Sequence, residues 1–202
     1  MSQKILVIGA AGQIGTELVL KLRESKGAQN VIAADLKEPN KEVLAGGKFV
    51  QLDILDELAV KTVINDNSIT EVYLLAALLS ATAEKNPMFA WKLNMDGLFN
   101  ILNIAKEGII KKVFWPSSIA VFGPSSPKKN TPQTTIMEPI TVYGISKQAG
   151  ERWCEYYFRQ YGVDVRSIRY PGLISYKSLP GGGTTDYAVD IYYKALENAS
   201  FT

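Results

Sequence analysis

The strongest chemical signal in the sequence is a tyrosine followed four residues later by a lysine, Tyr143 and Lys147. On a helix, side chains at this spacing share one face, so the phenol and the ammonium can lie one turn apart. A free phenol has a pKa near about 10, and lowering it by about three units requires roughly 4 kcal/mol. An ammonium about 5 Å away at an effective dielectric near 20 supplies about 3 kcal/mol. The pair is therefore predicted to act as a base, although the same spacing is also common on solvated helices.

A serine stands where it could join this pair. Ser118 lies in Pro116–Gly123, directly after the apolar run 112–115 and upstream of Tyr143. In open α/β sheets, ligands bind beyond the carboxyl ends of the strands, so a hydroxyl at this place can meet the Tyr143 helix. We predict that Ser118 is the third catalytic residue. The alternative, a serine that satisfies backbone groups in a turn, is favoured for Ser117.

A glycine-rich segment, Gly9–Gly15 (Gly-Ala-Ala-Gly-Gln-Ile-Gly), follows the first apolar run. Glycine permits a tight turn and lets backbone N–H groups approach a pyrophosphate, whose charge a helix N-terminus stabilises. Further along, Asp35 ends the second apolar run, where a carboxylate can accept hydrogen bonds from ribose hydroxyls. Together they predict a dinucleotide site, in which Asp35 favours NAD over NADP because it repels a 2′-phosphate. Two alternatives remain: the glycine-rich segment is an ordinary turn, and Asp35 only ends a strand. The nearby Lys37 could also alter the preference for NAD over NADP.

Composition excludes several other classes of chemistry. The 202 residues are 47% apolar and carry 22 basic and 20 acidic side chains, so neither nucleic acid nor a membrane surface is expected as a partner. Histidine is absent and cysteine occurs once, at Cys154, which excludes histidine triads, His or Cys zinc sites and internal disulfides. No metal is predicted, and Cys154 is interpreted as a small buried hydrophobe. The apolar start, 5–8, is too short for a spanning helix and a poor secretory signal, which indicates a cytoplasmic protein.

The elements that must position these residues alternate between short apolar runs and amphipathic stretches. This pattern is typical of an α/β fold, a parallel sheet with helices on both faces. Strands are predicted at 4–8, 30–35, 48–52, 71–75, 112–115 and 164–169. Helices are predicted at 12–26, 57–67, 87–107, 141–161 and 186–198. Two segments rich in Pro, Gly, Ser and Thr, 123–135 and 175–185, are predicted to be long loops.

With these pieces in register, the whole chain resembles the extended short-chain dehydrogenase/reductase family. The matching residues are Gly9, Gly12, Gly15, Ser118, Tyr143 and Lys147. The resemblance implies a doubly wound Rossmann sheet, NAD as cofactor and a Ser-Tyr-Lys triad. It also implies a set of further cofactor contacts, namely Gln13, Ile14, Asp35, Asp53, Ile54, Leu75, Ala76, Ala77, Asn94, Tyr143, Lys147, Tyr170, Gly172, Leu173 and Ile174.

Most members of this family act on nucleotide sugars, but three segments resemble one group within it, the short-chain L-threonine 3-dehydrogenases. These segments are 77–87, 169–175 and 180–188. The resemblance implies oxidation of the L-threonine C3 hydroxyl to 2-amino-3-oxobutanoate, with Tyr143 as general base and Ser118 and Lys147 assisting. It implies substrate contacts for Ser80, Ser118, Tyr143, Thr184 and Thr185. A nucleotide-sugar epimerase or dehydratase and a non-catalytic NAD-binding module are the alternatives.

Family members are longer than this chain, and their last third supplies much of the substrate-side lobe. We therefore expect an NAD-binding Rossmann domain at 1–174, followed at 175–202 by the start of a truncated substrate-binding lobe. Helices 87–107 and 141–161 carry bulky apolar residues on more than one face, which is compatible with a core position. In the resembling family these two helices pair with their copies in a four-helix bundle, which implies a homodimer.

Overall fold

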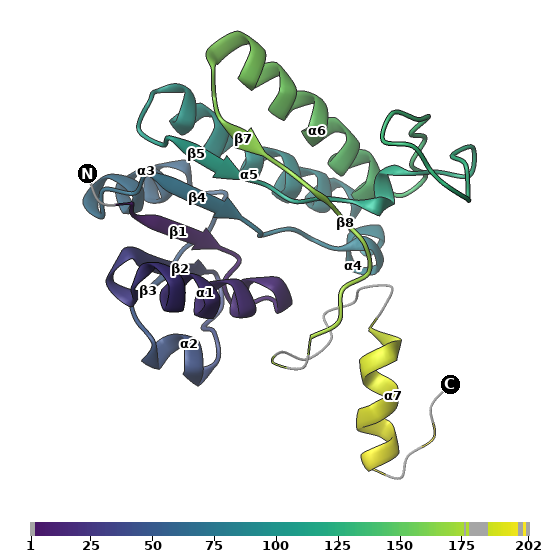
Figure 1. Ribbon diagram of the computed structural model, residues 1–202, viewed down its shortest axis with the longest axis horizontal. Coiled ribbons are helices and arrows are strands. Elements are labelled where there is room, and N and C mark those ends of the chain that lie inside the picture. Colours follow the sequence, from purple (N-terminus) through teal and green to yellow (C-terminus); the bar gives the residue numbers. More distant parts are fainter. Residues whose placement is uncertain (1–2, 176, 178–185, 198–199, 201–202) are drawn as a thin grey trace.

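The computed structural model describes residues 3–175, 177, 186–197 and 200. Its main feature is a parallel six-stranded sheet in the order β3-β2-β1-β4-β5-β7 (Figure 1). The strands are β1 (Ile5–Ile8), β2 (Val31–Asp35), β3 (Phe49–Gln51), β4 (Glu71–Leu74), β5 (Lys112–Phe114) and β7 (Val165–Arg166). Two further short strands, β6 (Ser117–Ser118) and β8 (Arg169–Tyr170), form a separate parallel pair. The predicted α/β class and the doubly wound, Rossmann-like sheet are confirmed.

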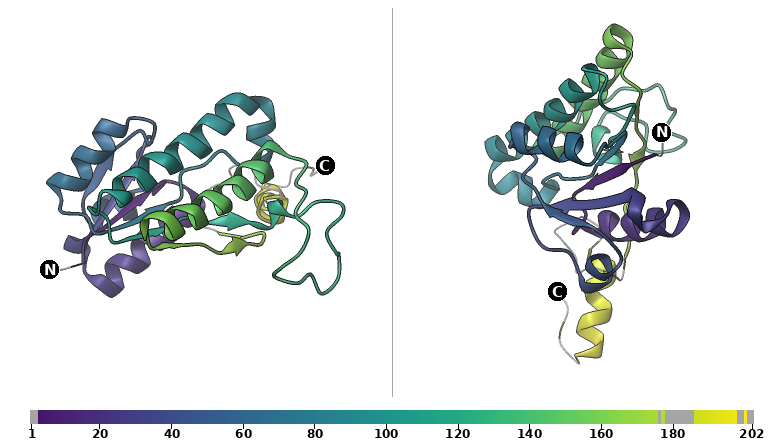
Figure 2. Two further views of the ribbon diagram at one scale, coloured as in Figure 1. Left: turned by 90° about the horizontal axis from the view of Figure 1, so that it is seen from above. Right: turned by 90° about the vertical axis from the view of Figure 1, so that its left-hand side faces the viewer.

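Helices cover both faces of this sheet. They are α1 (Gln13–Lys26), α2 (Lys41–Ala45), α3 (Glu57–Asp66), α4 (Ser80–Lys85), α5 (Pro87–Lys106), α6 (Val142–Tyr161) and α7 (Tyr187–Leu196), with 3-10 turns η1 (Ala28–Asn30) and η2 (Ile119–Val121). Helices α5 and α6 run side by side over one face, and α1 and α2 lie on the other (Figures 1 and 2). Helix α7 extends away from the sheet, and none of its described residues is buried (Figure 1).

Alternation along β1 divides the core into two parts. Ile5 and Val7 pack with side chains of α1 and α2, whereas Leu6 and Ile8 pack with side chains of α3 and α5. All four are at most 1% exposed. Successive side chains of a strand point to opposite faces, so a strand that is covered on both sides has to be apolar throughout. This is why the central strands appear in the sequence as unbroken apolar runs.

The prediction of a single strand at 164–169 is wrong. The structure has β7 beside β5 and, after a break, β8 beside β6. The backbone N–H groups of Trp115 and Ser117 both donate to this segment, at 3.0 Å to Arg166 and 2.9 Å to Ile168, so the two chains stay aligned across the break. At the break the Ser117 N–H is shared between the Ile168 carbonyl oxygen and Ser167 Oγ at 3.2 Å, so a side chain competes with the regular backbone pairing. Beyond it, β6 carries Ser118 past the carboxyl edge of the main sheet.

The other predicted strands agree with the structure to within one residue at each end, and so do the first four predicted helices. Two short helices, α2 and α4, were not predicted. Asn40 starts α2 by accepting a hydrogen bond from Val43 N at 3.0 Å, and Asn86 separates α4 from α5. Helices of five or six residues leave little periodicity in a sequence.

The predicted loop 123–135 contains no helix or strand. Most of the other predicted loop, 175–185, lies outside the described residues. Cys154 is buried, as expected. Within the part of the chain that the structure describes, no helix has the length and apolarity needed to cross a membrane.

Candidate active site

The glycine-rich segment forms the turn between β1 and α1. Gly9 has φ +93°, and a Cβ there would lie 2.6 Å from the backbone nitrogen of Ala76. A Cβ on Gly15 would lie 2.0 Å from the Gly9 carbonyl oxygen, whereas a Cβ on Gly12 would meet that oxygen only at 3.4 Å. The turn is thus packed tightly at Gly9 and Gly15 and open at Gly12, where no side chain caps the N-terminus of α1. An open, uncapped helix N-terminus fits the pyrophosphate of a dinucleotide.

Asp35 ends β2 beside this turn. Its Oδ2 accepts a hydrogen bond from Ala11 N at 2.9 Å, and its Oδ1 accepts one from Lys37 N at 3.1 Å. Asp35 therefore both ends a strand and tethers the glycine-rich turn. Each carboxylate oxygen keeps a lone pair with which it can accept a hydrogen bond from a ribose hydroxyl.

A cleft of about 240 Å³ lies between the glycine-rich turn, the start of α6 and the segment after β8. The predicted site residues that line it are Gly9, Gly12, Gln13, Ile14, Gly15, Leu75, Ala77, Ser80, Ser118, Tyr143, Lys147, Tyr170, Gly172 and Leu173. Gln13 also donates from Nε2 to the Leu173 carbonyl oxygen at 3.3 Å, which joins the turn to the opposite wall. The fold brings most of the predicted cofactor residues and all three predicted catalytic residues into one cleft.

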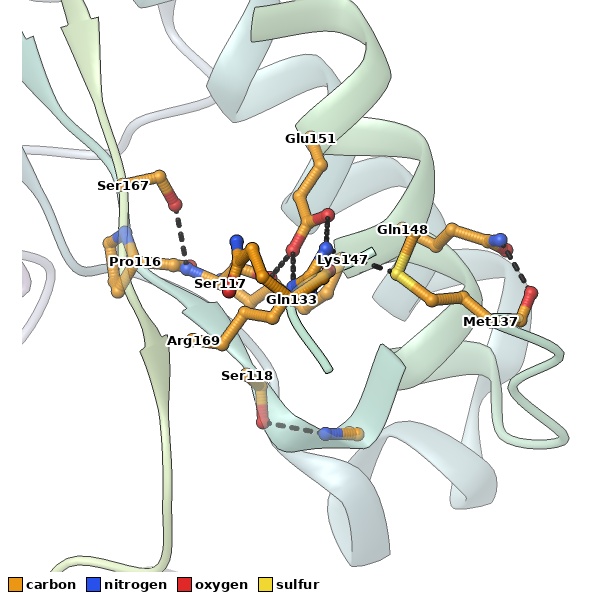
Figure 3. Close-up of polar contacts among 11 residues, drawn as sticks. Pro116, Ser117, Ser118, Gln133, Met137, Lys147, Gln148, Glu151, Ser167 and Arg169 are labelled. Atoms are coloured by element: carbon orange, nitrogen blue, oxygen red, sulfur yellow. Dashed lines mark hydrogen bonds and ion pairs between the residues drawn. The ribbon is translucent and has the colours of Figure 1, made fainter. Parts of the chain in front are cut away.

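The three catalytic candidates lie together where α6 meets β6. Lys147 Nζ lies 5.6 Å from the ring centroid of Tyr143 and donates to the Pro116 carbonyl oxygen at 2.6 Å. The Ser118 hydroxyl lies near enough to the Tyr143 phenol to favour its ionised form, which lowers the pKa of Tyr143. The Ser118 hydroxyl also accepts a hydrogen bond from Ala120 N at 3.1 Å, which fixes its orientation (Figure 3). The arrangement offers a phenol, a hydroxyl and an amine to a single reacting group.

Burial dominates the electrostatics of the pair. Lys147 is 3% exposed, and burial lowers its pKa to about 7, an effect that the neighbouring Cys154 opposes. Burial also raises the pKa of Tyr143, and the hydrogen bond with Ser118 opposes that rise. We expected Lys147 to lower the pKa of Tyr143, and this expectation is wrong for the protein without cofactor, where the net shift is upward. An estimate from distance alone leaves out the cost of removing both charges from water.

Replacing Lys147 by methionine is expected to stabilise the fold. The folded-state pKa of about 7 lies below the ordinary value of 10.5. Between these values the folded protein binds fewer protons than the unfolded chain, so the stability of the unaltered protein rises with pH. The penalty is present in full below pH 7 and disappears near pH 10.5. Allowing for the lost hydrogen bond to Pro116, we expect a gain of about 2 kcal/mol at neutral pH, or about 5 °C in Tm.

Thermal unfolding at neutral and at strongly alkaline pH measures this gain. Lys92→Met, which replaces an exposed lysine on α5, is the matched control and should leave Tm nearly unchanged. A Tm for Lys147→Met that does not rise at neutral pH would contradict the prediction, and so would a gain of equal size at the alkaline end.

The structure does not bring Asn94 to the cleft. Its side chain is 5% exposed, accepts a hydrogen bond from Leu78 N at 2.9 Å and donates to Ser146 Oγ at 3.2 Å. These bonds link α5, α6 and the segment that leads from β4 to Ser80. Asn94 therefore holds the cleft wall in place, and its own polar atoms are directed to the protein.

Five other predicted cofactor residues also lie outside the cleft lining, among them Asp35, which stands beside the glycine-rich turn. Ile54 is 4% exposed in the core on the α5 side, and Ala76 packs beneath Gly9. Asp53 and Ile174 are exposed, beyond β3 and beyond the cleft wall respectively. The predicted substrate contacts Thr184 and Thr185 lie outside the described residues.

Sequence reasoning missed several residues of the lining. These are Leu79, Pro116, Ser117, Pro171 and Asp186. The apolar residues among them could not be recognised from residue type, because they line the cleft with apolar side chains and backbone atoms. Asp186 could have been found, because it is the acidic residue of the segment 180–188 and its carboxylate could bind the ammonium group of an amino acid.

Comparison with known families extends this picture. Residues 5–196 match the sequence profile of one family, described as the NAD dependent epimerase/dehydratase family. The chain belongs to the NAD-dependent epimerase/dehydratase family. An uncharacterized epimerase/dehydratase of Staphylococcus saprophyticus is 52% identical over 201 residues, which make up 99% of this chain and 62% of that relative.

Two solved structures are similar to this family member along nearly its whole length. A partial consensus L-threonine 3-dehydrogenase superposes with a TM-score of 0.94 and 56% identity, over 98% of this chain and 63% of that one. The holo form of a GalE-like L-threonine dehydrogenase from Cupriavidus necator gives a TM-score of 0.92 and 55% identity, over 98% and 64%. The chain spans less than two thirds of the length of each of these relatives.

Proposed function

We propose that this chain oxidises the C3 hydroxyl of L-threonine, with NAD as cofactor, to 2-amino-3-oxobutanoate. The observation that carries the proposal is that Ser118, Tyr143 and Lys147 line one cleft with the glycine-rich turn. The similarity to L-threonine dehydrogenase structures, at 55% and 56% identity, supports threonine as the substrate over a nucleotide sugar.

NAD fits the residues that are present. Gly12 at the uncapped start of α1 would hold the pyrophosphate, and Asp35 would hold the adenosine ribose. Lys147, at the other end of the cleft lining, would hold the nicotinamide ribose. When bound, NAD supplies the hydride acceptor and a positively charged ring.

The chain's own residues handle the proton. Tyr143, as phenolate, would accept the proton of the C3 hydroxyl, and Ser118 would hold the reacting oxygen through its own hydroxyl. Lys147 favours the phenolate when it carries a charge. Because burial raises the pKa of Tyr143, we expect turnover to rise toward alkaline pH. Ser80, at the start of α4 in the cleft wall, is proposed to contact the amino acid together with Thr184 and Thr185.

Substrate oxidation is the direct test. NADH formation, followed by its near-ultraviolet absorbance, is expected after addition of L-threonine and absent with uridine or thymidine diphosphate sugars. Epimerised or dehydrated sugar without net NADH would favour the epimerase/dehydratase alternative. Binding of NAD with no product from either class of substrate would favour a non-catalytic module.

Asp35→Ala is expected to weaken NAD binding by about tenfold or more, because a charged acceptor of ribose hydrogen bonds contributes about 1.5–3 kcal/mol. Calorimetric titration with NAD measures the effect. Asp66→Ala, the control, removes an exposed carboxylate at the end of α3, and it should leave NAD affinity within about twofold. Equal or better use of NADP than NAD by the unaltered chain would show that Asp35 has been assigned the wrong role.

We also propose a homodimer formed through α5 and α6. Of the bulky residues on these helices, Leu98 and Tyr157 are core, whereas Phe89, Trp91 and Trp153 are 46%, 37% and 42% exposed. Trp153 packs edge-to-face with a ring of α5, so the exposed aromatic face is continuous across both helices. Light scattering at micromolar concentration should give the mass of two chains, and the mass of one chain would refute the proposal.

A further inference from the structure

A largely buried ion pair lies beside the segment that carries Ser118. Arg169 donates from Nε and from Nη2 to the two carboxylate oxygens of Glu151, each at 2.8 Å (Figure 3). The side chains of Arg169 and Glu151 are only 16% and 11% exposed. The hydroxyl of Ser117, next to Ser118, donates to the same carboxylate at 2.6 Å. Loss of one partner would leave a charge in poorly solvated surroundings, so these contacts hold together as a set.

Three successive turns of α6 each contact one residue of the segment that carries Ser118. The contacts are Tyr143 to Ser118, Lys147 to Pro116 and Glu151 to Ser117. The three helix residues are spaced four apart and therefore share one face. Of the three, only Glu151 lies outside the cleft lining.

Arg169 extends this anchor to the segment that follows η2. Its guanidinium lies 5.3 Å from the ring centroid of Phe122, and its Nη1 donates to the Gln133 carbonyl oxygen at 3.3 Å. Its Nη2 also lies 3.1 Å from Met137 Sδ. Arg169 begins β8, which pairs with β6. One side chain therefore joins α6, the loop after η2 and the strand of Ser118.

We propose that Glu151 and Arg169 are positioning residues that hold the Ser118 hydroxyl at the Tyr143 phenol. The proposal rests on the function proposed above. Neither side chain has to touch the reacting atoms, because both act by keeping β6 against α6. A displacement of about 1 Å at a catalytic group can lower turnover by about 100-fold, so a distant anchor of this kind can have a large effect.

The charges around the site agree with this role. Burial would raise the pKa of Glu151, but the hydrogen bonds from Arg169 and Ser117 outweigh burial and lower it, so the paired group is a carboxylate at neutral pH. The Ser118 hydrogen bond lowers the pKa of Tyr143, and its loss should raise that pKa further. Other charged groups in this region are Lys147 on α6, Asp186 in the cleft wall, and Glu84 of α4, whose carboxylate accepts a hydrogen bond from Val142 N, next to Tyr143 in the chain.

Glu151→Gln is the first test, because it keeps the shape of the side chain and removes its charge. The ionisation of Tyr143 is measured as the difference in ultraviolet absorbance between each protein and the same protein carrying Tyr143→Phe, as pH rises. For Glu151→Gln we expect this ionisation to move upward by about half a pH unit or more. We also expect kcat to fall by about tenfold or more while NAD affinity stays within about twofold.

Glu155→Gln is the matched control. It removes a carboxylate from the same helix, where Glu155 forms exposed ion pairs with Arg152 and Arg159. It should leave the Tyr143 ionisation, kcat and NAD affinity nearly unchanged. An equal shift in the Glu155→Gln protein would mean that any charge change on α6 suffices, which overturns the proposal.

Ser117→Ala covers the case in which Glu151→Gln does not fold. It removes the hydroxyl anchor and leaves the ion pair intact, and we expect a smaller upward shift of the Tyr143 ionisation. If Tm falls while both variants keep the original ionisation of Tyr143, the pair is purely structural and the proposal is overturned. The ionisation is read without substrate or cofactor. A chain that fails to oxidise threonine would therefore count against the proposed function alone.

Discussion

Tyr143→Phe is expected to lower turnover of L-threonine by about 100-fold or more and to leave NAD affinity nearly unchanged. The variant loses one oxygen and keeps the ring, so its packing in the cleft is preserved. What disappears is the acceptor for the hydroxyl proton, an interaction needed mainly in the transition state. Steady-state kinetics gives the change in kcat, and calorimetric titration gives the NAD affinity.

Tyr170→Phe is the matched control for this experiment. Tyr170 also lines the cleft, but it extends from β8 and has no lysine one helical turn away. Removing its hydroxyl should lower turnover by less than about tenfold. If Tyr143→Phe kept the original turnover, Tyr143 could not be the base, whatever its position in the cleft.

Gly15→Ala should weaken NAD binding strongly and destabilise the protein. The new Cβ would lie 2.0 Å from the Gly9 carbonyl oxygen and 2.8 Å from the Ala10 Cα. Both contacts are with backbone atoms, so the turn itself has to move. We expect a loss of about 2–3 kcal/mol in the free energy of unfolding. We also expect NAD binding to weaken by about 100-fold, which corresponds to about 2.7 kcal/mol. Denaturant unfolding and calorimetric titration measure the two effects separately.

Gly12→Ala separates the two effects. Its Cβ would meet only the Gly9 carbonyl oxygen, at 3.4 Å, so the free energy of unfolding should change by less than about 1 kcal/mol. Gly12 lines the cleft at the uncapped start of α1, and a methyl group there should still weaken NAD binding. Equal destabilisation by the two variants, or full NAD affinity in Gly15→Ala, would contradict the account of this turn.

The main sheet could be predicted from the sequence because its strands are covered on both faces. Leu6 and Val7 point to opposite layers, and both have to be apolar. The break between β7 and β8 could not be predicted from 164–169 itself. It falls where Ser117 of the partner strand shares its N–H between the Ile168 carbonyl oxygen and Ser167 Oγ, and a pattern read along one segment carries no information about its neighbour.

The site divides in the same way. Tyr143, Lys147 and the glycine-rich turn carry signals in their own spacing, and the cleft contains all of them. The direction of the Tyr143 pKa could not be predicted, because it depends on how much water the fold removes. Glu151 was within reach of sequence reasoning, since it repeats the four-residue spacing of the Tyr143 face. The role of Glu151 becomes visible only in the structure, which places Arg169 against its carboxylate.

Three consecutive turns of α6 contact the tripeptide 116–118, and this limits which changes of sequence α6 can accept. A single added or deleted residue between 143 and 151 would rotate one end of the helix face by about 100° relative to the other. No change of side chain could then restore all three contacts together. Substitutions should be tolerated far better than insertions or deletions in this stretch, so libraries that randomise it should hold its length constant.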